Sequence, residues 1–177
     1  MKQILISFLI FTFGTAFSNH IDKLELKNTG VYPAIITLDS TYTSEIIYKR
    51  AKEWIQSYYS NPFQVLKLDA FPNLRLNGFI ENGCCYKSLG YPTCIDYSYI
   101  LEIDVKEGKY RLTYTITEVS QKGKILTFLP ADFFKEDGTL KKIYNSAVPT
   151  INESMNELNL SLYKYIIGET VKKKNDW

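Results

Sequence analysis

Two carboxylates have the residue type and the spacing for acid–base chemistry. Glu102 and Asp104 stand two apart in a segment of alternating apolar and polar residues. Successive side chains of a β-strand point to opposite faces, so these two would share one face. In a cleft, such a pair could serve as the acid and the base of a hydrolase acting on glycans. The simpler interpretation, which we favour, is a solvated sheet face on which Asp104 pairs with Arg111 of the next strand.

Three cysteines form a second group, namely Cys84, Cys85 and Cys94, in a stretch rich in Gly, Pro and Tyr that we interpret as a loop. A disulfide from Cys94 to either Cys84 or Cys85 would suit an oxidising compartment. Adjacent residues of an extended chain point in opposite directions, so only one of the two easily meets Cys94. A zinc site needs about four N or S ligands, and a catalytic thiol needs a basic partner. The only histidine, His20, is a poor candidate for either role.

The common motifs for phosphate, dinucleotide and zinc binding and for serine hydrolysis do not occur in the chain. With a single histidine, the usual general base of Ser-His-Asp, Cys-His and metal-dependent mechanisms is missing. We therefore expect a non-catalytic protein with no catalytic residues, no cofactor and no metal.

The first 18 residues have the pattern of an export signal. Lys2 precedes an apolar run over residues 4–13, and Ala16 and Ser18 provide a small-x-small cleavage pattern. The run is shorter than the roughly 20 apolar residues that span a membrane. We expect residues 1–18 to be a signal peptide and the mature protein to be periplasmic or secreted, with no transmembrane segment after cleavage.

The composition is that of one globular domain. The chain has 177 residues, of which 45% are hydrophobic and 23% charged, with a formal net charge of +2. Nucleic-acid-binding domains carry a clustered basic excess, so this charge predicts no nucleic-acid partner. We divide the mature chain into an N-terminal tail over residues 19–29, one domain over residues 30–168 and a C-terminal tail over residues 169–177.

Hydrophobic periodicity predicts the elements of the domain. A strand is expected over residues 30–39, although Pro33 favours an edge or an irregular start. Apolar residues at helical spacing predict one amphipathic helix up to Tyr59, with Trp54 on its apolar face, and a second from Pro149 to about Gly168. Short strands are expected over residues 65–70 and 74–80.

Residues 97–117 give the strongest signal, because two alternating runs flank a turn at residues 106–109. Pairing Val105 with Tyr110 places Asp104 opposite Arg111 and buries the apolar residues of both runs on one face. A slip of one residue would mix the two faces, so the pattern fixes the register. The helices should cover the apolar face and leave the polar face open to solvent.

Two helices over one face of an antiparallel sheet make an α+β two-layer sandwich. The segments at residues 48–54 (Tyr-Lys-Arg-Ala-Lys-Glu-Trp) and 105–111 (Val-Lys-Glu-Gly-Lys-Tyr-Arg) resemble an uncharacterised exported-domain family of Bacteroidota-type bacteria, a domain of unknown function with a TBP-like fold. The resemblance covers about residues 31–168. It implies a curved sheet backed by helices, in exported bacterial proteins with no assigned activity.

Two functional hypotheses follow from the sequence. The first is an exported module without catalytic activity that binds a protein, a glycan or an envelope component through the open sheet face or the cysteine segment. The second is the carboxylate-based glycan hydrolase described above. The candidate interaction surface consists of three aromatic and three charged residues: Phe79, Tyr86, Tyr91, Glu102, Asp104 and Arg111.

Overall fold

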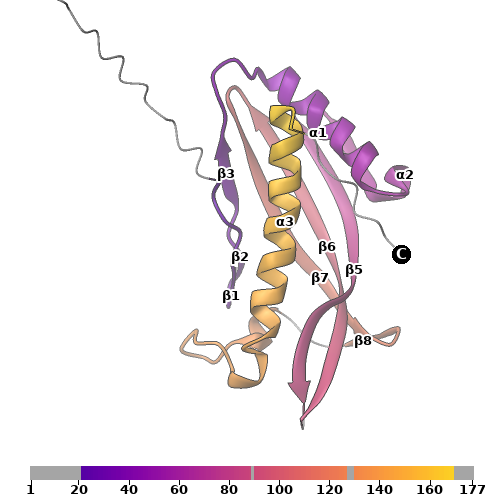
Figure 1. Cartoon of the computed structure of the whole chain (residues 1–177), viewed down its shortest axis with the longest axis vertical. Coiled ribbons are helices and arrows are strands. Elements are labelled where there is room, and N and C mark those ends of the chain that lie inside the picture. The colour runs from indigo at the N-terminus through magenta and orange to yellow at the C-terminus, as the bar shows by residue number, and fades with distance from the viewer. Residues whose placement is uncertain (1–20, 89, 127–129, 170–177) are drawn as a thin grey trace, which may run out of the picture.

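The computed structural model describes residues 21–88, 90–126 and 130–169 (Figure 1). Its helices are α1 (Ser44–Tyr58), the short α2 (Pro62–Val65) and the long α3 (Ala147–Ile167). Its strands are β1 (Leu26–Lys27), β2 (Gly30–Val31), β3 (Ala34–Thr37), β4 (Leu66–Ala70), β5 (Asn73–Ser88), β6 (Tyr91–Lys106), β7 (Lys109–Gln121) and β8 (Lys124–Leu126). The expected signal peptide lies outside the described residues.

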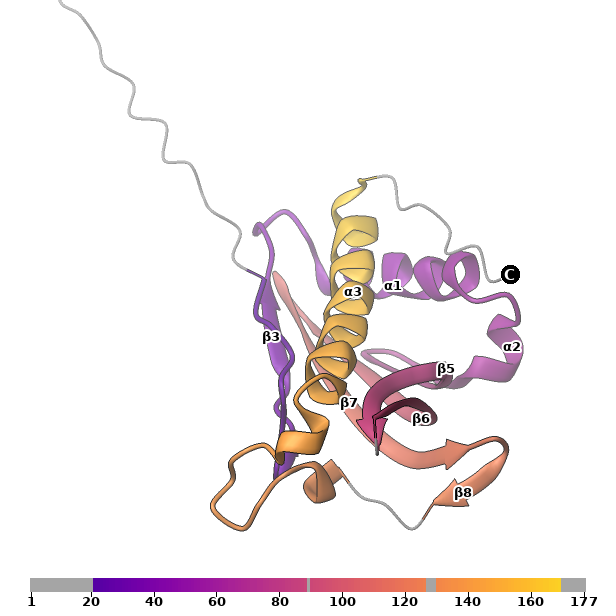
Figure 2. The ribbon, with the colours of Figure 1, turned by 60° about the horizontal axis from the view of Figure 1, so that its bottom comes forward.

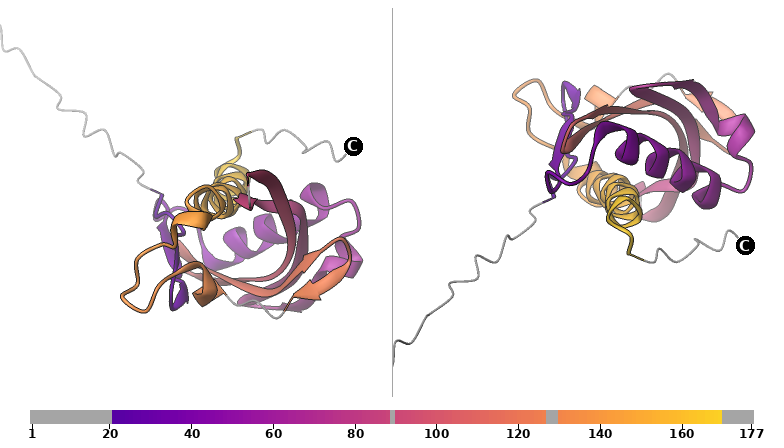
Figure 3. Two further views of the ribbon diagram at one scale, coloured as in Figure 1. Left: turned by 90° about the horizontal axis from the view of Figure 1, so that it is seen from below. Right: turned by 90° about the horizontal axis from the view of Figure 1, so that it is seen from above.

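Six of the strands form one antiparallel sheet with the order β3-β7-β6-β5-β4, and β8 pairs with β7. Viewed from its two ends in Figure 3, the sheet curls around α1 and α3. Figure 2 shows α3 in the opening between β3 and the β5–β6 hairpin. The chain is thus an α+β fold with a curved sheet, as expected, and the free face of the sheet is its convex side.

The predicted register of the central hairpin is confirmed. Val105 lies opposite Tyr110, Ile103 opposite Leu112 and Asp104 opposite Arg111. Inward residues of β6 and β7 are buried, and the polar residues between them are half-buried or exposed. The alternation in sequence fixed this arrangement because any other register would have exposed the apolar set to water.

Helix α1 starts at a capped end and buries one face. The Thr43 side chain accepts a hydrogen bond from the Ile46 N–H, and the Glu107 carboxylate accepts one from the Ser44 N–H at 3.0 Å. Trp54 is fully buried, and its indole N–H donates to the Ser161 hydroxyl of α3 at 3.1 Å. The two helices therefore pack against each other as well as against the sheet.

Two glycines make room for core tyrosines. Gly78 on β5 lies opposite Tyr99 on β6, and a Cβ atom at Gly78 would stand 2.1 Å from the Tyr99 ring. Gly83 lies under the Tyr97 ring in the same way. Tyr99 also stacks on Tyr114, with ring centroids 4.6 Å apart. The aromatic rings thus fill the space that the glycines leave, which lets them lie flat across the sheet.

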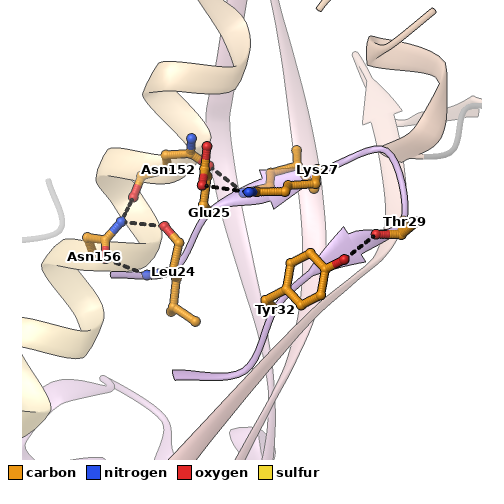
Figure 4. A network of polar contacts seen from close by, with 8 residues as sticks. Leu24, Glu25, Lys27, Thr29, Tyr32, Asn152 and Asn156 are labelled. Atoms are coloured by element: carbon orange, nitrogen blue, oxygen red, sulfur yellow. Dashed lines mark hydrogen bonds and ion pairs between the residues drawn. The ribbon is translucent and has the colours of Figure 1, made fainter. Parts of the chain in front are cut away.

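The N-terminal segment before the domain is not a tail, contrary to our expectation. Leu24 and Leu26 are only 1% and 2% exposed, because they complete the core beside α3. The side-chain amide of Asn156 bonds both the N–H and the C=O of Leu24, and that of Asn152 accepts from the Leu26 N–H at 2.8 Å (Figure 4). Asparagines on one face of α3 therefore hold the backbone of this segment, in which β1 also pairs with β2.

The expected strand over residues 30–39 is also interrupted. It forms two short strands, β2 and β3, on either side of Pro33. Proline has no N–H to donate to a sheet, so the ladder breaks there. The domain consequently begins with an irregular edge, pinned by α3 rather than by continuous strand pairing.

We predict that Gly78→Ala lowers the free energy of unfolding by about 1–3 kcal/mol, because the new methyl group collides with the Tyr99 ring. Chemical denaturation of the variant measures the loss, and Asn77→Ala at the adjacent exposed position should change stability by less than about 0.5 kcal/mol. In a Tyr99→Leu background the cost of Gly78→Ala should largely vanish. An equal cost in both backgrounds would contradict the proposed collision.

The core tyrosines should also make the protein sensitive to alkali. Burial raises the pKa of Tyr97 to about 12 and the pKa values of Tyr99, Tyr110 and Tyr114 further still. In the unfolded chain these phenols ionise near pH 10, so the stability that their protonated forms provide is lost as the pH rises above that value. We expect tyrosinate absorbance and near-UV circular dichroism to change in one cooperative step above about pH 10. Gradual ionisation without unfolding would contradict this.

Candidate functional site

The convex surface of the sheet, here called the open face, is formed by outward-pointing residues of three neighbouring strands. No helix covers it among the described residues (Figure 3). Strand alternation decides its membership. Most of these residues stand between buried neighbours, whereas Asn77 and Phe79 flank the half-buried Gly78, and Thr117 lies at a bulge before the exposed Glu118. Its residues are Arg75, Asn77, Phe79, Ser98, Ile100, Glu102, Asp104, Arg111, Thr113, Thr115 and Thr117.

The charged residues at the centre of the open face are paired with one another. Asp104 Oδ2 accepts two hydrogen bonds from Arg111, from Nε at 2.9 Å and from Nη2 at 2.6 Å. The side-chain amide of Asn73 donates to the other oxygen of the same carboxylate. Glu102 lies 3.8 Å from the Arg75 guanidinium. Because these pairs are exposed, each adds at most about 1 kcal/mol to stability, and their main effect is to leave this part of the face nearly neutral.

The two carboxylates lie two residues apart on one face of β6. Each is paired with its own arginine, Glu102 with Arg75 and Asp104 with Arg111. The second pair is the one that the register of the hairpin predicts.

A hollow of about 480 Å³ opens beside Phe79. Strand β4 begins at Leu66, which pairs with Leu76, so the β5 edge beyond Leu76 has no partner in β4. Gly78 adds no side chain there, and the hydroxyls of Tyr59 and Tyr99 meet at 2.9 Å in the wall. The remaining lining is mainly polar: Gln64, Lys67, Asn77, Ser98 and Thr117. We call this the Phe79 hollow.

The Phe79 hollow combines an aromatic surface with hydrogen-bonding groups. Phe79 is 59% exposed, and among the described residues it has neither a cation–π contact nor a contact with another aromatic ring. Amide and hydroxyl side chains around it can both donate and accept hydrogen bonds. Its volume and lining match those of a site for part of an uncharged polar ligand.

The cysteine segment is part of a strand pair, which corrects our interpretation of it as a loop. β5 and β6 continue past a bulge between Ile80 and Cys84, and Cys85 lies directly opposite Cys94. These two form a disulfide, with a Cα–Cα distance of 4.1 Å. Cys84 points into the core as a free thiol, and burial raises its pKa to about 12. The expectation that only one of the adjacent cysteines pairs with Cys94 is confirmed.

The three candidate aromatic residues do not form one surface. Tyr86 points inward, packs against the core and lies edge-to-face with Tyr144. Tyr91 is 76% exposed at the far end of the β5–β6 hairpin. Phe79 alone adjoins a hollow of the open face. The bulge in β5 between Ile80 and Cys84 and the alternation of side chains along the strand separate these residues. No local sequence motif marks the bulge.

Within the described ranges, no group of three or more His, Cys, Asp and Glu side chains is arranged to hold a metal ion. His20 lies outside those ranges. In the same part of the chain, no helix is both long and apolar enough to span a membrane.

Comparison with solved structures places the fold. A TBP-like protein from Parabacteroides distasonis matches over 78% of this chain and 93% of its own, with a TM-score of 0.59 and 10% sequence identity. A DUF4468 family protein from Bacteroides ovatus matches over 87% of this chain and 94% of its own, with a TM-score of 0.55 and 10% identity. The chain has a TBP-like fold. No family model and no curated protein sequence matches it.

These similarities agree with the resemblance inferred from the sequence, an uncharacterised TBP-like domain family of Bacteroidota. At this level of identity they show the shared fold alone, and fold does not determine function. The function must therefore be argued from the open face.

We predict that the disulfide between Cys85 and Cys94 forms in the native protein, while Cys84 resists alkylation until the protein is denatured. The physical reasons are the directly opposed positions of the pair and the burial of the third thiol. Peptide mapping by mass spectrometry under non-reducing conditions, with alkylation before and after denaturation, tests both points. Removing the disulfide by Cys85→Ala should cost about 2–3 kcal/mol of stability for so short a loop, whereas Cys84→Ala should leave the disulfide intact. A Cys84–Cys94 linkage would contradict this assignment.

Proposed function

We propose that this protein is an exported, non-catalytic module that binds an envelope component through the open face of its sheet, and that the ligand is a neutral glycan segment held in the Phe79 hollow. The single observation that carries the proposal is that hollow, in which an exposed aromatic ring adjoins amide and hydroxyl side chains. Ligand sites in proteins typically combine these features.

The chemistry of a sugar ring fits this lining. A pyranose has an apolar C–H face, which can pack on an aromatic ring, and a rim of hydroxyls. Asn77 and Gln64 offer amides to those hydroxyls, and Ser98 and Thr117 offer hydroxyls of their own. The arginines and carboxylates at the centre of the face are paired with one another, and Lys67 in the lining can donate hydrogen bonds to sugar hydroxyls.

The export of the protein is part of the proposal. Its support is the basic start, apolar run and small-residue cleavage pattern of residues 1–18. The disulfide between Cys85 and Cys94 suits the oxidising conditions outside the cytoplasm. A periplasmic or secreted location would bring the open face into contact with envelope polymers.

The same face argues against nucleic acid as the ligand. Binding to a duplex requires cations that neutralise phosphates, or apolar wedges for the minor groove. Near the centre of the face, Arg75 and Arg111 are already paired with carboxylates. The face is also convex, so it would touch a duplex along a line and could not wrap around it.

The proposal is tested with glycans released from the envelope of the source bacterium and the purified protein. We expect saturable binding in isothermal calorimetry, reduced at least tenfold by Phe79→Ala because the stacking surface is lost, a change of about 1.4 kcal/mol. Tyr91→Ala is the matched control, since it removes another exposed aromatic ring that lies outside the hollow.

Two outcomes would contradict the proposal. One is equal loss of binding in both variants, which would indicate non-specific aromatic contacts. The other is the appearance of new reducing ends in the glycan, provided that Glu102→Gln abolishes them, because this would establish the carboxylate-based hydrolase instead.

A further inference from the structure

A second hollow lies at the end of the open face, where β6 turns into β7. It has a volume of about 190 Å³ and is lined by Ile35, Asp104, Lys106, Lys109, Tyr110 and Arg111. We call it the turn hollow. It shares no lining residue with the Phe79 hollow, so its ligand is a separate question.

Two lysines from neighbouring strands line this hollow. Lys106 and Lys109 are a directly opposed pair in the β6–β7 ladder, and both are exposed. Like charges in directly opposed positions destabilise a sheet. Among the residues that the structure describes, no carboxylate forms an ion pair with either lysine.

The nearest acid does not relieve this repulsion. Glu107 stands between the lysines in the turn, but its carboxylate accepts the hydrogen bond from the Ser44 N–H at the start of α1. The residue that could have neutralised the pair is therefore engaged on the helix side of the sheet. A local arrangement that costs stability without compensation is a common mark of a functional site.

The charge of the turn hollow matches a dianion. Its three cations, Lys106, Lys109 and Arg111, and its one carboxylate, Asp104, leave a net charge of +2. A phosphate monoester carries about −1.5 to −2 at pH 7, whereas a sulfate ester or a carboxylate carries −1. Asp104 also holds the Arg111 guanidinium in a fixed orientation through two hydrogen bonds.

We propose that the turn hollow binds a phosphate monoester group, with Lys106 and Lys109 neutralising the dianion and Arg111 oriented beside it by Asp104. Ile35, which is 52% exposed, provides an apolar wall for the carbon body that carries the phosphate. The phosphate can belong to a soluble ester or to a lipid headgroup, since both present the same group to the hollow.

The test uses three probes that share one body and differ in charge: phenyl phosphate, phenyl sulfate and phenol, at about pH 8, where the phosphate is a dianion. Amide chemical shifts of the protein report binding and its location. We expect saturable shifts at residues 106–111 with phenyl phosphate, at least fivefold weaker binding of phenyl sulfate, and no saturable shifts there with phenol.

Variants separate the proposed site from general screening of charge. Lys106→Gln and Lys109→Gln should each weaken phenyl phosphate binding about fivefold to tenfold, since each removes one charge-assisted contact. Lys124→Gln, which removes an exposed lysine at the turn between β7 and β8, should leave binding unchanged. Both lysine positions are solvent-exposed, so the variants should fold, and unchanged amide shifts elsewhere confirm it.

Equal binding of the sulfate and the phosphate, an equal effect of Lys124→Gln, or the absence of saturable shifts would each overturn the proposal.

The source of the phosphate is distinguished by cosedimentation with phosphatidylcholine vesicles with and without phosphatidic acid. Binding that needs phosphatidic acid and is lost in Lys106→Gln identifies a lipid headgroup. Binding to phenyl phosphate with no vesicle binding identifies a soluble ester. The glycan experiment at the Phe79 hollow can fail without affecting this result, and the reverse also holds.

Discussion

The pairing of Val105 with Tyr110 across the β6–β7 turn is the constraint on which the rest of the structure depends. Between Tyr97 and Val105 and between Tyr110 and Ile116, it sends the apolar residues other than Ile100 to the concave side, where α1 and α3 cover them. It also sets the composition of the open face, since the polar residues have only the convex side left. A shift of β7 by one residue against β6 would bury Arg111 and expose Leu112, which the hydrophobic effect strongly disfavours.

Alternation and helical periodicity made the centre of the fold predictable. The register of β6 and β7, the burial of Trp54 and the polar character of the open face all follow from local patterns in the sequence. The paired state of Asp104 follows from the same register, because it places Arg111 directly opposite.

The features that the sequence did not predict, the packed N-terminal segment and the Phe79 hollow, depend on contacts between residues that are distant in the chain. The N-terminal segment resembled a tail because its hydrogen-bond partners are distant in sequence. The backbone N–H groups of its two leucines donate to asparagines of α3, more than a hundred residues later. Those asparagines recur on one helix face, which is a signal that could have been noticed. The Phe79 hollow depends on where β4 pairs with β5, and on a glycine opposite a tyrosine. Neither leaves a recognisable motif in one sequence.

The open face thus has a neutral centre and two distinct hollows. Paired charges between them contribute little to stability and prevent strong attraction of ions to the middle of the face. Binding specificity would then come from the two hollows, one aromatic and hydrogen-bonding, the other cationic. A TBP-like fold with its helices inside the curve leaves this convex surface as the place for such sites.

The central claim is that the open face, and not the helical side, contacts the ligand. Mapping amide chemical-shift changes on addition of envelope glycan fragments tests it most directly, because every residue reports independently. We expect changes clustered at Asn77, Phe79, Ser98 and Thr117. Changes clustered instead on the solvent-facing residues of α1, such as Lys49 and Glu53, would contradict it.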